Sequence, residues 1–303
     1  MDFIKDSISI LISTKNRLED LKKTLNNINH LIGRNDVICV IYDDGSTDGT
    51  SAYISEYYPD IILYINIVSK GYIYCRNKML NAVTTEFAIS VDDDAHFITE
   101  NPLGLITEFF DKNPRVGLLG FRVYWSKNEI FNHFTTEIPV RMQSFVGCAH
   151  VWRMQAWKDI ADYPEWFIFY GEENFASYEL FKQKWEIYYL PEVLVQHRVD
   201  LHERKNKGDF GLRQRRSLCS GWSLFFLFIP FSKIPRLMAY TIWMQLKLKV
   251  FKGDITALKS IFLGLIDLAV KMPKNLTHRN ALTEKEYIAY KSIEEAKIYW
   301  KPE

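Results

Sequence analysis

The stretch from Val37 to Thr50, VICVIYDDGSTDGT, decides how the chain folds. Its first six residues are apolar and rich in β-branched side chains, which predicts a strand buried on both faces of a parallel sheet. The Asp, Ser, Thr and Gly residues that follow are typical of a turn that ends a strand and begins a helix. A buried strand followed by a polar loop and a helix is the repeating unit of an α/β protein.

The same pattern recurs on both sides of this stretch. Further short apolar runs predict strands at Ile8–Ile12, Ile61–Ile67 and Phe87–Val91. Apolar residues at three- and four-residue spacing predict helices at Leu18–Ile32, Thr50–Tyr58 and Tyr72–Val83. This order predicts an α/β fold with a mostly parallel central sheet and helices on both faces. In such sheets ligands bind at the carboxyl ends of the strands.

Acidic residues gather at these strand ends. Asp43 and Asp44 follow the second predicted strand, and Asp92-Asp93-Asp94 follow the fourth. Clustered carboxylates repel one another unless a cation compensates their charge, and Mg²⁺ or Mn²⁺ prefers such oxygen ligands. Taken alone, DDGSTDGT is equally consistent with a solvated turn that caps a helix. The second acidic group, on the same edge of the sheet, favours a functional site.

Three segments together resemble a known family. ISILISTKNR (residues 8–17), VICVIYDDGSTDGT (37–50) and GYIYCRNKMLNAVTTEFAISVDDDAHF (71–97) are similar to the inverting family 2 glycosyltransferases of GT-A fold, including bacterial polysaccharide and rhamnosyltransferase-like members. The resemblance covers about Ile8 to Val199. It implies a Rossmann-like GT-A catalytic domain at residues 1–205, with a nucleotide-binding part at about 1–98 and an acceptor part at about 99–205.

The resemblance also implies roles for individual residues. The residues implied to bind the donor nucleotide are Thr14, Arg17, Asp43, Asp44, Arg76, Asp92 and Asp93. Asp94, at the end of the DxD position, and His197, after an expected strand that follows Pro191, are implied to bind the metal ion. For His197 an ordinary hydrogen-bonding role is the alternative.

The catalytic base is expected in the segment FYGEEN, residues 169–174, just before a helical segment at Phe175–Lys184. The resemblance places the base at Glu173, with Glu172 as the competing carboxylate. Acids at a helix start are also common because they stabilise the helix dipole. The acceptor side is expected around GCAHVWR, residues 147–153, with Gly147, Trp152 and Arg153.

These expectations together predict an inverting, metal-assisted glycosyltransferase. The donor would be a nucleoside-diphosphate sugar, and the acceptor a saccharide or lipid-linked glycan in cell-envelope polysaccharide synthesis. One alternative is a non-catalytic module that binds sugar nucleotides or polysaccharides. A less favoured one is a phosphotransfer enzyme with Asp43 as nucleophile, since such enzymes usually carry the acidic loop on the first strand.

The last third of the chain, residues 206–303, differs from the rest. After a charged segment, Leu201–Asp209, apolar aromatic helices are expected at Leu218–Phe231, Leu237–Phe251 and Ile255–Val270. From Arg198 onward there are 20 Lys and Arg but 10 Asp and Glu, of the 38 and 37 in the whole chain. The longest uncharged run has 16 residues, fewer than the roughly 20 that span a membrane.

This basic, aromatic composition indicates an amphipathic helical region that lies on an anionic membrane surface. A helical subdomain packed on the sheet is the alternative. Nucleic-acid binding is disfavoured because the basic residues alternate with apolar ones. The four cysteines form no CxxC pair and the N-terminus is too polar for a signal peptide. A cytoplasmic location is therefore expected, with peripheral attachment to the inner face of the cytoplasmic membrane.

Overall fold

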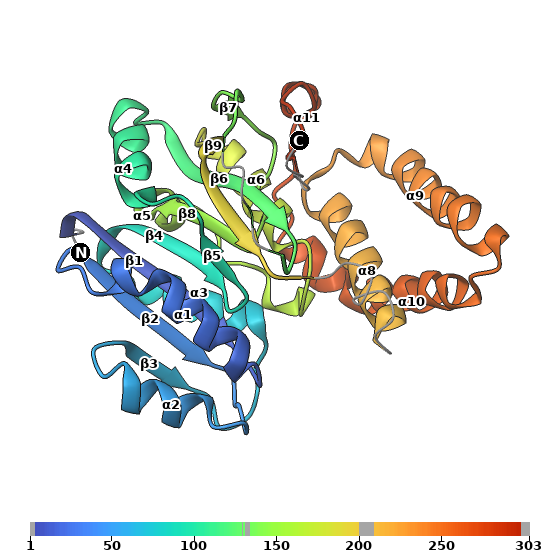
Figure 1. The fold of residues 1–303 in the computed structure, drawn as a ribbon. Coiled ribbons are helices and arrows are strands. Elements are labelled where there is room, and N and C mark those ends of the chain that lie inside the picture. Colours follow the sequence, from blue (N-terminus) through green and yellow to red (C-terminus); the bar gives the residue numbers. More distant parts are fainter. Residues whose placement is uncertain (1–3, 129, 131–133, 200–208, 298–303) are drawn as a thin grey trace.

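The computed structural model describes residues 4–128, 130, 134–199 and 209–297. Within these residues a nine-stranded sheet has helices on both faces, and further helices extend from one side as an arm (Figure 1). The strands are β1 (Ile4–Thr14), β2 (Val37–Asp43), β3 (Ile62–Ile65), β4 (Thr85–Asp92), β5 (Ala95–Phe97), β6 (Val116–Trp125), β7 (Val140–Arg141), β8 (Ala149–Arg153) and β9 (Glu186–His197). The α-helices are α1 (Leu18–Ile32), α2 (Thr50–Tyr57), α3 (Tyr72–Ala82), α4 (Pro102–Lys112), α5 (Met154–Lys158), α6 (Glu172–Lys182), α8 (Phe210–Phe228), α9 (Ile234–Leu248), α10 (Ile255–Thr277) and α11 (Glu284–Lys291).

The sheet has the order β3-β2-β1-β4-β8-β6-β9-β5, with β7 paired to β9. The first four strands in this order are parallel, as the strand–helix alternation predicts. Beyond them the sheet is mixed, because β8 runs antiparallel to both β4 and β6, and β5 and β7 run antiparallel to β9. The α/β fold is therefore confirmed, and its parallel part is the first half.

The strands and helices expected in the first 98 residues are all present, with shifted ends. β1 begins at Ile4 instead of Ile8, and β3 is shorter than the expected Ile61–Ile67. The helix expected at Phe175–Lys184 begins at Glu172, because Gly171 adopts a left-handed conformation with φ of 87° and turns the chain into the helix. Glu172 and Glu173 therefore lie in the first turn of α6.

Alternating side chains of the strands form two cores. Ile8, Ile10 and Ile12 of β1 face the core that α1, α2 and α4 cover. Leu11 points to the opposite core, where α3, α5 and α6 pack. This alternation explains why the strands read as continuous apolar runs, since a central parallel strand is buried on both faces.

The C-terminal helices are joined to the sheet domain by α8. Leu224, Leu227 and Phe228, at the end of α8, lie in the same core as α3 and α6. Earlier in α8, Cys219 and Trp222 pack instead against α10 in a small separate core. One end of α8 therefore belongs to the sheet domain and the other, with α9 and α10, to the helical arm (Figure 1).

The C-terminal helices have different ends from those expected. α8 begins at Phe210 rather than Leu218, since its first turns are amphipathic, with Gln214 buried between basic residues. α10 continues past Pro273 to Thr277, and its buried Asn275 bonds Ser223 and Trp166.

Most of the expected linker, Leu201–Asp209, lies outside the described residues, as does the expected domain boundary near residue 205. None of the described helices combines the length and apolarity needed to cross a bilayer.

We expect Phe228→Ala to lower the free energy of unfolding by about 3 kcal/mol, because it leaves a cavity in the shared core. The side chain of Phe228 is fully buried, whereas Phe262 of α10 is 65% exposed. Phe262→Ala is the matched control and should change the stability by less than about 0.5 kcal/mol. Urea unfolding followed by circular dichroism measures both. Equal effects would mean that α8 does not pack in the sheet domain.

Candidate active site

The carboxyl ends of β1, β2 and β4 meet at one edge of the sheet. Thr14, the last residue of β1, pairs with Asp43 of β2, and Ser13 pairs with Asp92 of β4. The turn after β4 carries Asp93 and Asp94. The carboxylates that the sequence places after two different strands therefore lie on the two strands that flank β1.

Asp93 and Asp94 are held by one arginine. The Arg17 guanidinium lies 3.1 Å from an Asp93 oxygen and 2.6 Å from an Asp94 oxygen. Thr14 donates a hydrogen bond of 2.8 Å to Asp93. Burial raises the pKa of Asp93 to about 7 despite the opposing charge of Arg17. Arg17 therefore neutralises part of the negative charge that this buried turn concentrates.

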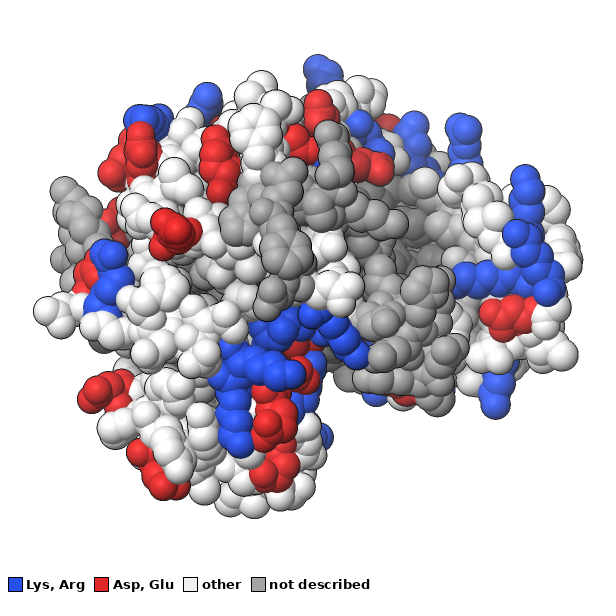
Figure 2. All heavy atoms as spheres, in the orientation of Figure 1, with Lys and Arg blue, Asp and Glu red and all other residues white. Residues whose placement is uncertain are grey.

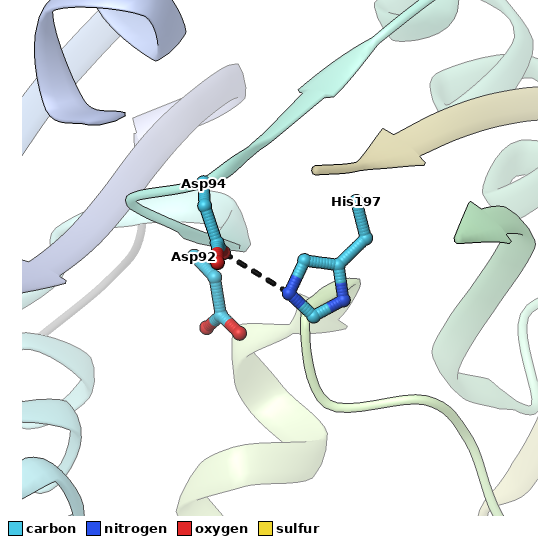
Figure 3. Close-up of side chains that lie close together, drawn as sticks. All are labelled: Asp92, Asp94 and His197. Atoms are coloured by element: carbon cyan, nitrogen blue, oxygen red, sulfur yellow. Dashed lines mark ion pairs between the residues drawn. The ribbon is translucent and has the colours of Figure 1, made fainter. Parts of the chain in front are cut away.

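Asp92, Asp94 and His197 form a group that could hold a metal ion. One ligand atom from each lies within 4.8 Å of the others, and His197 Nε2 is 3.0 Å from Asp94 Oδ1 (Figure 3). β9 brings His197 to this point because Ala95 of β5 pairs with it. Two carboxylates and an imidazole suit Mg²⁺ or Mn²⁺. His197 faces the two carboxylates with Nε2, so this nitrogen would be the one to bind a cation.

The charged forms of Asp94 and His197 stabilise each other. Burial disfavours ionisation of Asp94, but the hydrogen bond from His197 and the Arg17 guanidinium hold its pKa below the ordinary value. Burial likewise disfavours the charged form of His197, but Cys148 and Asp94 raise its pKa above the ordinary value. Trp125 packs on the imidazole at 4.3 Å between ring centroids and fixes its orientation.

Asp43 and Asp44 are both engaged within the protein. Asp44 accepts four hydrogen bonds, from the side chains of Asn66 and Ser69 and from the backbone N–H groups of residues 70 and 71. Asp43 accepts from the backbone N–H of Ser46 and from the Ser51 hydroxyl. Both carboxylates therefore shape the loops at this edge of the sheet. A nucleotide that bound to either would share these hydrogen bonds or replace them.

Arg76 links the two halves of the site. Its guanidinium donates to Asp92 at 2.7 Å and to the carbonyl oxygen of Gly147 at 2.9 Å, and stacks over the Tyr72 ring at 4.3 Å. Tyr72 and Arg76 are four residues apart on α3 and so face the same side of the helix. Because Gly147 lies in the turn just before β8, Arg76 fixes the predicted acceptor segment against the predicted nucleotide part.

Glu172 and Glu173 have different surroundings. Glu172 is buried, and its Oε2 has no hydrogen-bond partner among the described residues. Burial and the neighbouring Glu173 raise the pKa of Glu172 to about 8. Glu173 is partly exposed and approaches Gly147 so closely that a Cβ at that position would collide with its carboxylate. Glu173 is therefore the more exposed of the two carboxylates, and both line the same cavity.

Two cavities meet at Asp92 and His197. The larger has a volume of about 1040 Å³ and contains Glu173, with walls from α6, α8, α9 and the segment after α11. The smaller has a volume of about 690 Å³ and contains Asp94 with several cations. The residues that line both are Asp92, Phe169, Tyr170, His197 and Arg213. The arrangement places a cation site between two compartments, each large enough for a ligand.

Two predicted acceptor residues lie away from these cavities. Trp152 is fully buried and packs edge-on against Trp157 and Tyr163. The Arg153 guanidinium donates to the carbonyl oxygens of Val116 and Phe110 behind the sheet. Neither lines the larger cavity: Trp152 is packed in the core, and Arg153, on the opposite face of the strand, is held by its hydrogen bonds. The acceptor segment reaches the cavity through residues 143–148 instead.

Other residues at the cavities were not predicted from the sequence. Tyr170 lines both cavities and has a φ of 73°, so its backbone is held in the left-handed region next to Gly171. Arg213 and Arg216 of α8 line the smaller cavity together with Arg198. The four-residue spacing of Tyr72 and Arg76 could have predicted that the two side chains stack on one face of a helix. The positions of Arg213 and Arg216 depend on the packing of α8, for which the sequence has no local signal.

Residues 9–176 match the protein family described as Glycosyl transferase family 2. No curated protein sequence matches the chain significantly. The solved structures that resemble it have low sequence identity and therefore establish the fold alone.

One is the crystal structure of GalNAc-T7 with UDP, GalNAc and Mn²⁺, with a TM-score of 0.58, 14% identity and coverage of 73% of this chain and 48% of that one. Another is the mannosyltransferase PcManGT from Pyrobaculum calidifontis with GDP-Man and Mn²⁺, with a TM-score of 0.55, 15% identity and coverage of 94% and 78%. A third is S. aureus TarS 1-349 with UDP-GlcNAc, with a TM-score of 0.51, 18% identity and coverage of 71% and 66%. The chain thus spans about half the length of the GalNAc-T7 chain.

We expect Asp94→Ala and His197→Ala each to weaken Mn²⁺ binding at least about tenfold, because each removes a direct ligand. Isothermal titration calorimetry with Mn²⁺ alone measures this. Asp36→Asn is the matched control, since Asp36 is an exposed acid paired with Arg34 far from the cavities. Unchanged Mn²⁺ affinity in both Asp94→Ala and His197→Ala would place the ion elsewhere.

Proposed function

The chain belongs to glycosyl transferase family 2, and we propose that it transfers a sugar from a nucleoside-diphosphate sugar to a hydroxyl group of a glycan or lipid-linked acceptor, with inversion at the anomeric carbon. The observation that carries the proposal is the position of the Asp92–Asp94–His197 group between two cavities, one of which contains Glu173. Residues 1–205 would form the catalytic domain, and residues 206–303 a helical region that closes the larger cavity.

The smaller cavity is the proposed donor site. Arg17, Arg198 and Arg216 line it beside the acidic group, which suits a diphosphate that binds together with a cation. Asp92, Asp94 and His197 would hold Mg²⁺ or Mn²⁺, which when bound neutralises the charge that develops on the leaving diphosphate. The crystallised neighbours contain UDP, UDP-GlcNAc or GDP-Man, and two contain Mn²⁺. Thr14, Asp43, Asp44, Arg76 and Asp93 stay proposed nucleotide-binding residues on this edge of the sheet.

Glu173 is the proposed catalytic base. Its carboxylate faces the larger cavity from the first turn of α6, whereas Glu172 is buried with a pKa that keeps it protonated at neutral pH. Glu173 would take the proton of the acceptor hydroxyl. The hydroxyl oxygen then forms a bond to the anomeric carbon while the bond from that carbon to the diphosphate oxygen breaks and its electron pair leaves with the diphosphate. A single displacement inverts the anomeric configuration.

We expect Glu173→Gln to lower kcat about 10²- to 10⁴-fold, because it removes the base and keeps the shape of the side chain. Glu172→Gln is the matched control, since an amide resembles a protonated carboxyl, and it should stay within about tenfold of wild type by the same reasoning. The donor for the assay is chosen among UDP-, dTDP- and GDP-sugars by Mn²⁺-dependent thermal stabilisation. The opposite result, with Glu172→Gln inactive and Glu173→Gln active, would transfer the role to Glu172.

The pH dependence of kcat/KM gives a second readout of the same change. Burial raises the pKa of Glu173 above its ordinary value of 4.5, although Arg76 opposes the effect. A base acts only when it is deprotonated, so activity should rise with pH through this raised pKa and then level off. In Glu173→Gln the residual activity should lack this acidic limb. If the fall in activity at acidic pH persisted unchanged in Glu173→Gln, it would reflect the titration of another residue.

The alternatives have less support from the geometry. A phosphotransfer role for Asp43 is disfavoured because its carboxylate is fully buried and bonded to Ser46 and Ser51. A non-catalytic binding module would not need a partly exposed Glu173 beside the junction of the two cavities. Donor binding without turnover across acceptors would favour the module.

The helical arm is the proposed contact with an anionic membrane surface, on the inner face of the cytoplasmic membrane. From residue 231 to residue 277 there are eight Lys and Arg against two acids, Asp254 and Asp267. Large apolar side chains on the same segment are exposed: Phe231, Tyr240, Trp243, Leu248, Phe251, Ile255, Leu258, Phe262, Ile266 and Val270. Figure 2 shows basic side chains spread over this arm with uncharged surface between them, the pattern of helices that lie in a membrane interface. Such attachment fits a role in cell-envelope polysaccharide synthesis.

We expect the wild-type chain to float with vesicles that contain phosphatidylglycerol, and a variant with Trp243→Ser, Phe251→Ser and Phe262→Ser to lose most of this binding. Each inserted large apolar side chain contributes about 1.5–3 kcal/mol at full burial, so the triple change should weaken binding more than about tenfold. The matched control changes exposed apolar residues at the opposite edge of the sheet, Tyr57→Ser, Ile65→Ser and Ile67→Ser. Equal flotation of both variants would exclude the arm as the contact.

A further inference from the structure

The wall of the larger cavity opposite the sheet is made by α8 and α9. Gln214 of α8 donates a hydrogen bond of 3.1 Å to Gln245 of α9, and both side chains line the cavity. Gln214 is 8% exposed, and its Oε1 has no hydrogen-bond partner among the described residues. A buried amide oxygen without a donor indicates that a ligand hydroxyl or a water molecule normally occupies this part of the cavity.

Cations lie on both sides of this amide pair. Arg213 precedes Gln214 on α8, and Lys249 lies four residues after Gln245 at the end of α9. Both line the larger cavity. Arg213 is paired with Asp209, whereas the Lys249 ammonium forms no hydrogen bond or ion pair within the described part of the chain. Burial lowers the pKa of Lys249, although Asp254 favours its charge. A partly buried ammonium without a close partner in a cavity is a site that an anion would complete.

Lys249 also lies where the cavity wall meets the outer surface of the arm. Its neighbours Leu248 and Phe251 are exposed on the apolar, basic surface described above. On the other side of the same cavity lies Glu173. One continuous space therefore has the proposed base at one wall and an unpaired cation at another, and this cation borders the surface that would face a membrane.

We infer that Lys249, beside Gln245, forms a subsite for a phosphate group of the acceptor, and that the Gln214 oxygen accepts a hydrogen bond from a hydroxyl of the same ligand. The inference rests on the proposed function and deepens it, because it gives the acceptor a chemical class: a saccharide joined through a phosphate to an apolar chain. The acceptor hydroxyl faces Glu173, the phosphate accepts hydrogen bonds from Lys249, and the chain leaves the cavity along Leu248 and Phe251. Arg213 borders the same cavity and adds positive charge.

Geranyl phosphate tests the subsite without any need for turnover. Calorimetry in the absence of divalent cations should detect its binding to the full chain, and Lys249→Met should weaken that binding about tenfold or more, the loss expected for a charge-assisted hydrogen bond. Lys252→Met, on the next turn of the same surface, is the matched control and should stay within about twofold by the same scale. Geraniol, which lacks the phosphate, should bind wild type and Lys249→Met alike.

Further binding measurements show whether the phosphate must be joined to an apolar chain and whether it binds in this cavity. Glucose 1-phosphate that bound as tightly as geranyl phosphate would overturn the lipid part of the inference. Binding of geranyl phosphate that depended on Arg17 rather than Lys249 would place the phosphate in the donor cavity and overturn the subsite. Failure of the proposed function is distinct, because it would appear as absent donor binding and unchanged activity in Glu173→Gln, whatever Lys249→Met does.

Discussion

The whole site depends on the compensation of negative charge at the end of β4. Asp92, Asp93 and Asp94 are consecutive, and Asp93 and Asp94 are buried, where unpaired carboxylates would be strongly destabilising. The protein supplies a positive partner to each of them: Arg76 to Asp92, and Arg17 to Asp93 and Asp94. His197 pairs with Asp94 on its remaining side. Four elements, α1, α3, β4 and β9, are therefore held in register by charge around the place where a cation would bind.

The C-terminal helices belong to this site as well as to the arm. α8 buries Leu227 and Phe228 in the core of the sheet domain, and its first turns bring basic residues to both cavities. Residues after α10 return to the sheet domain, where Asn280 bonds Glu179 and Tyr290 bonds the backbone of Gln143. The same helices therefore wall the larger cavity and expose the apolar surface of the arm.

Much of the site was predictable because its residues follow strands. Asp92 and Asp94 could be placed on one sheet edge from their positions alone, and His197 from the strand that precedes it. The distinction between Glu172 and Glu173 was not predictable, since both begin α6 and differ only in what surrounds them. Trp152 and Arg153 were expected at the acceptor because of their place in the sequence, but Trp152 packs in the core and Arg153 bonds the carbonyl oxygens of Val116 and Phe110 on the other face of the sheet.

The sequence by itself determined the order of strands and helices as far as β4, the α/β class and the clustering of acidic residues at one edge of the sheet, because hydrophobic periodicity and strand-end polarity are local properties. Only the tertiary structure decided the mixed second half of the sheet, the partners of Asp43 and Asp44, and the place of Lys249 in the wall of the larger cavity. These features depend on contacts between segments that are far apart in the chain, such as the bond between Gln214 and Gln245. Local patterns contain no information on such contacts, since any exposed helix could carry the same residues without a cavity behind them.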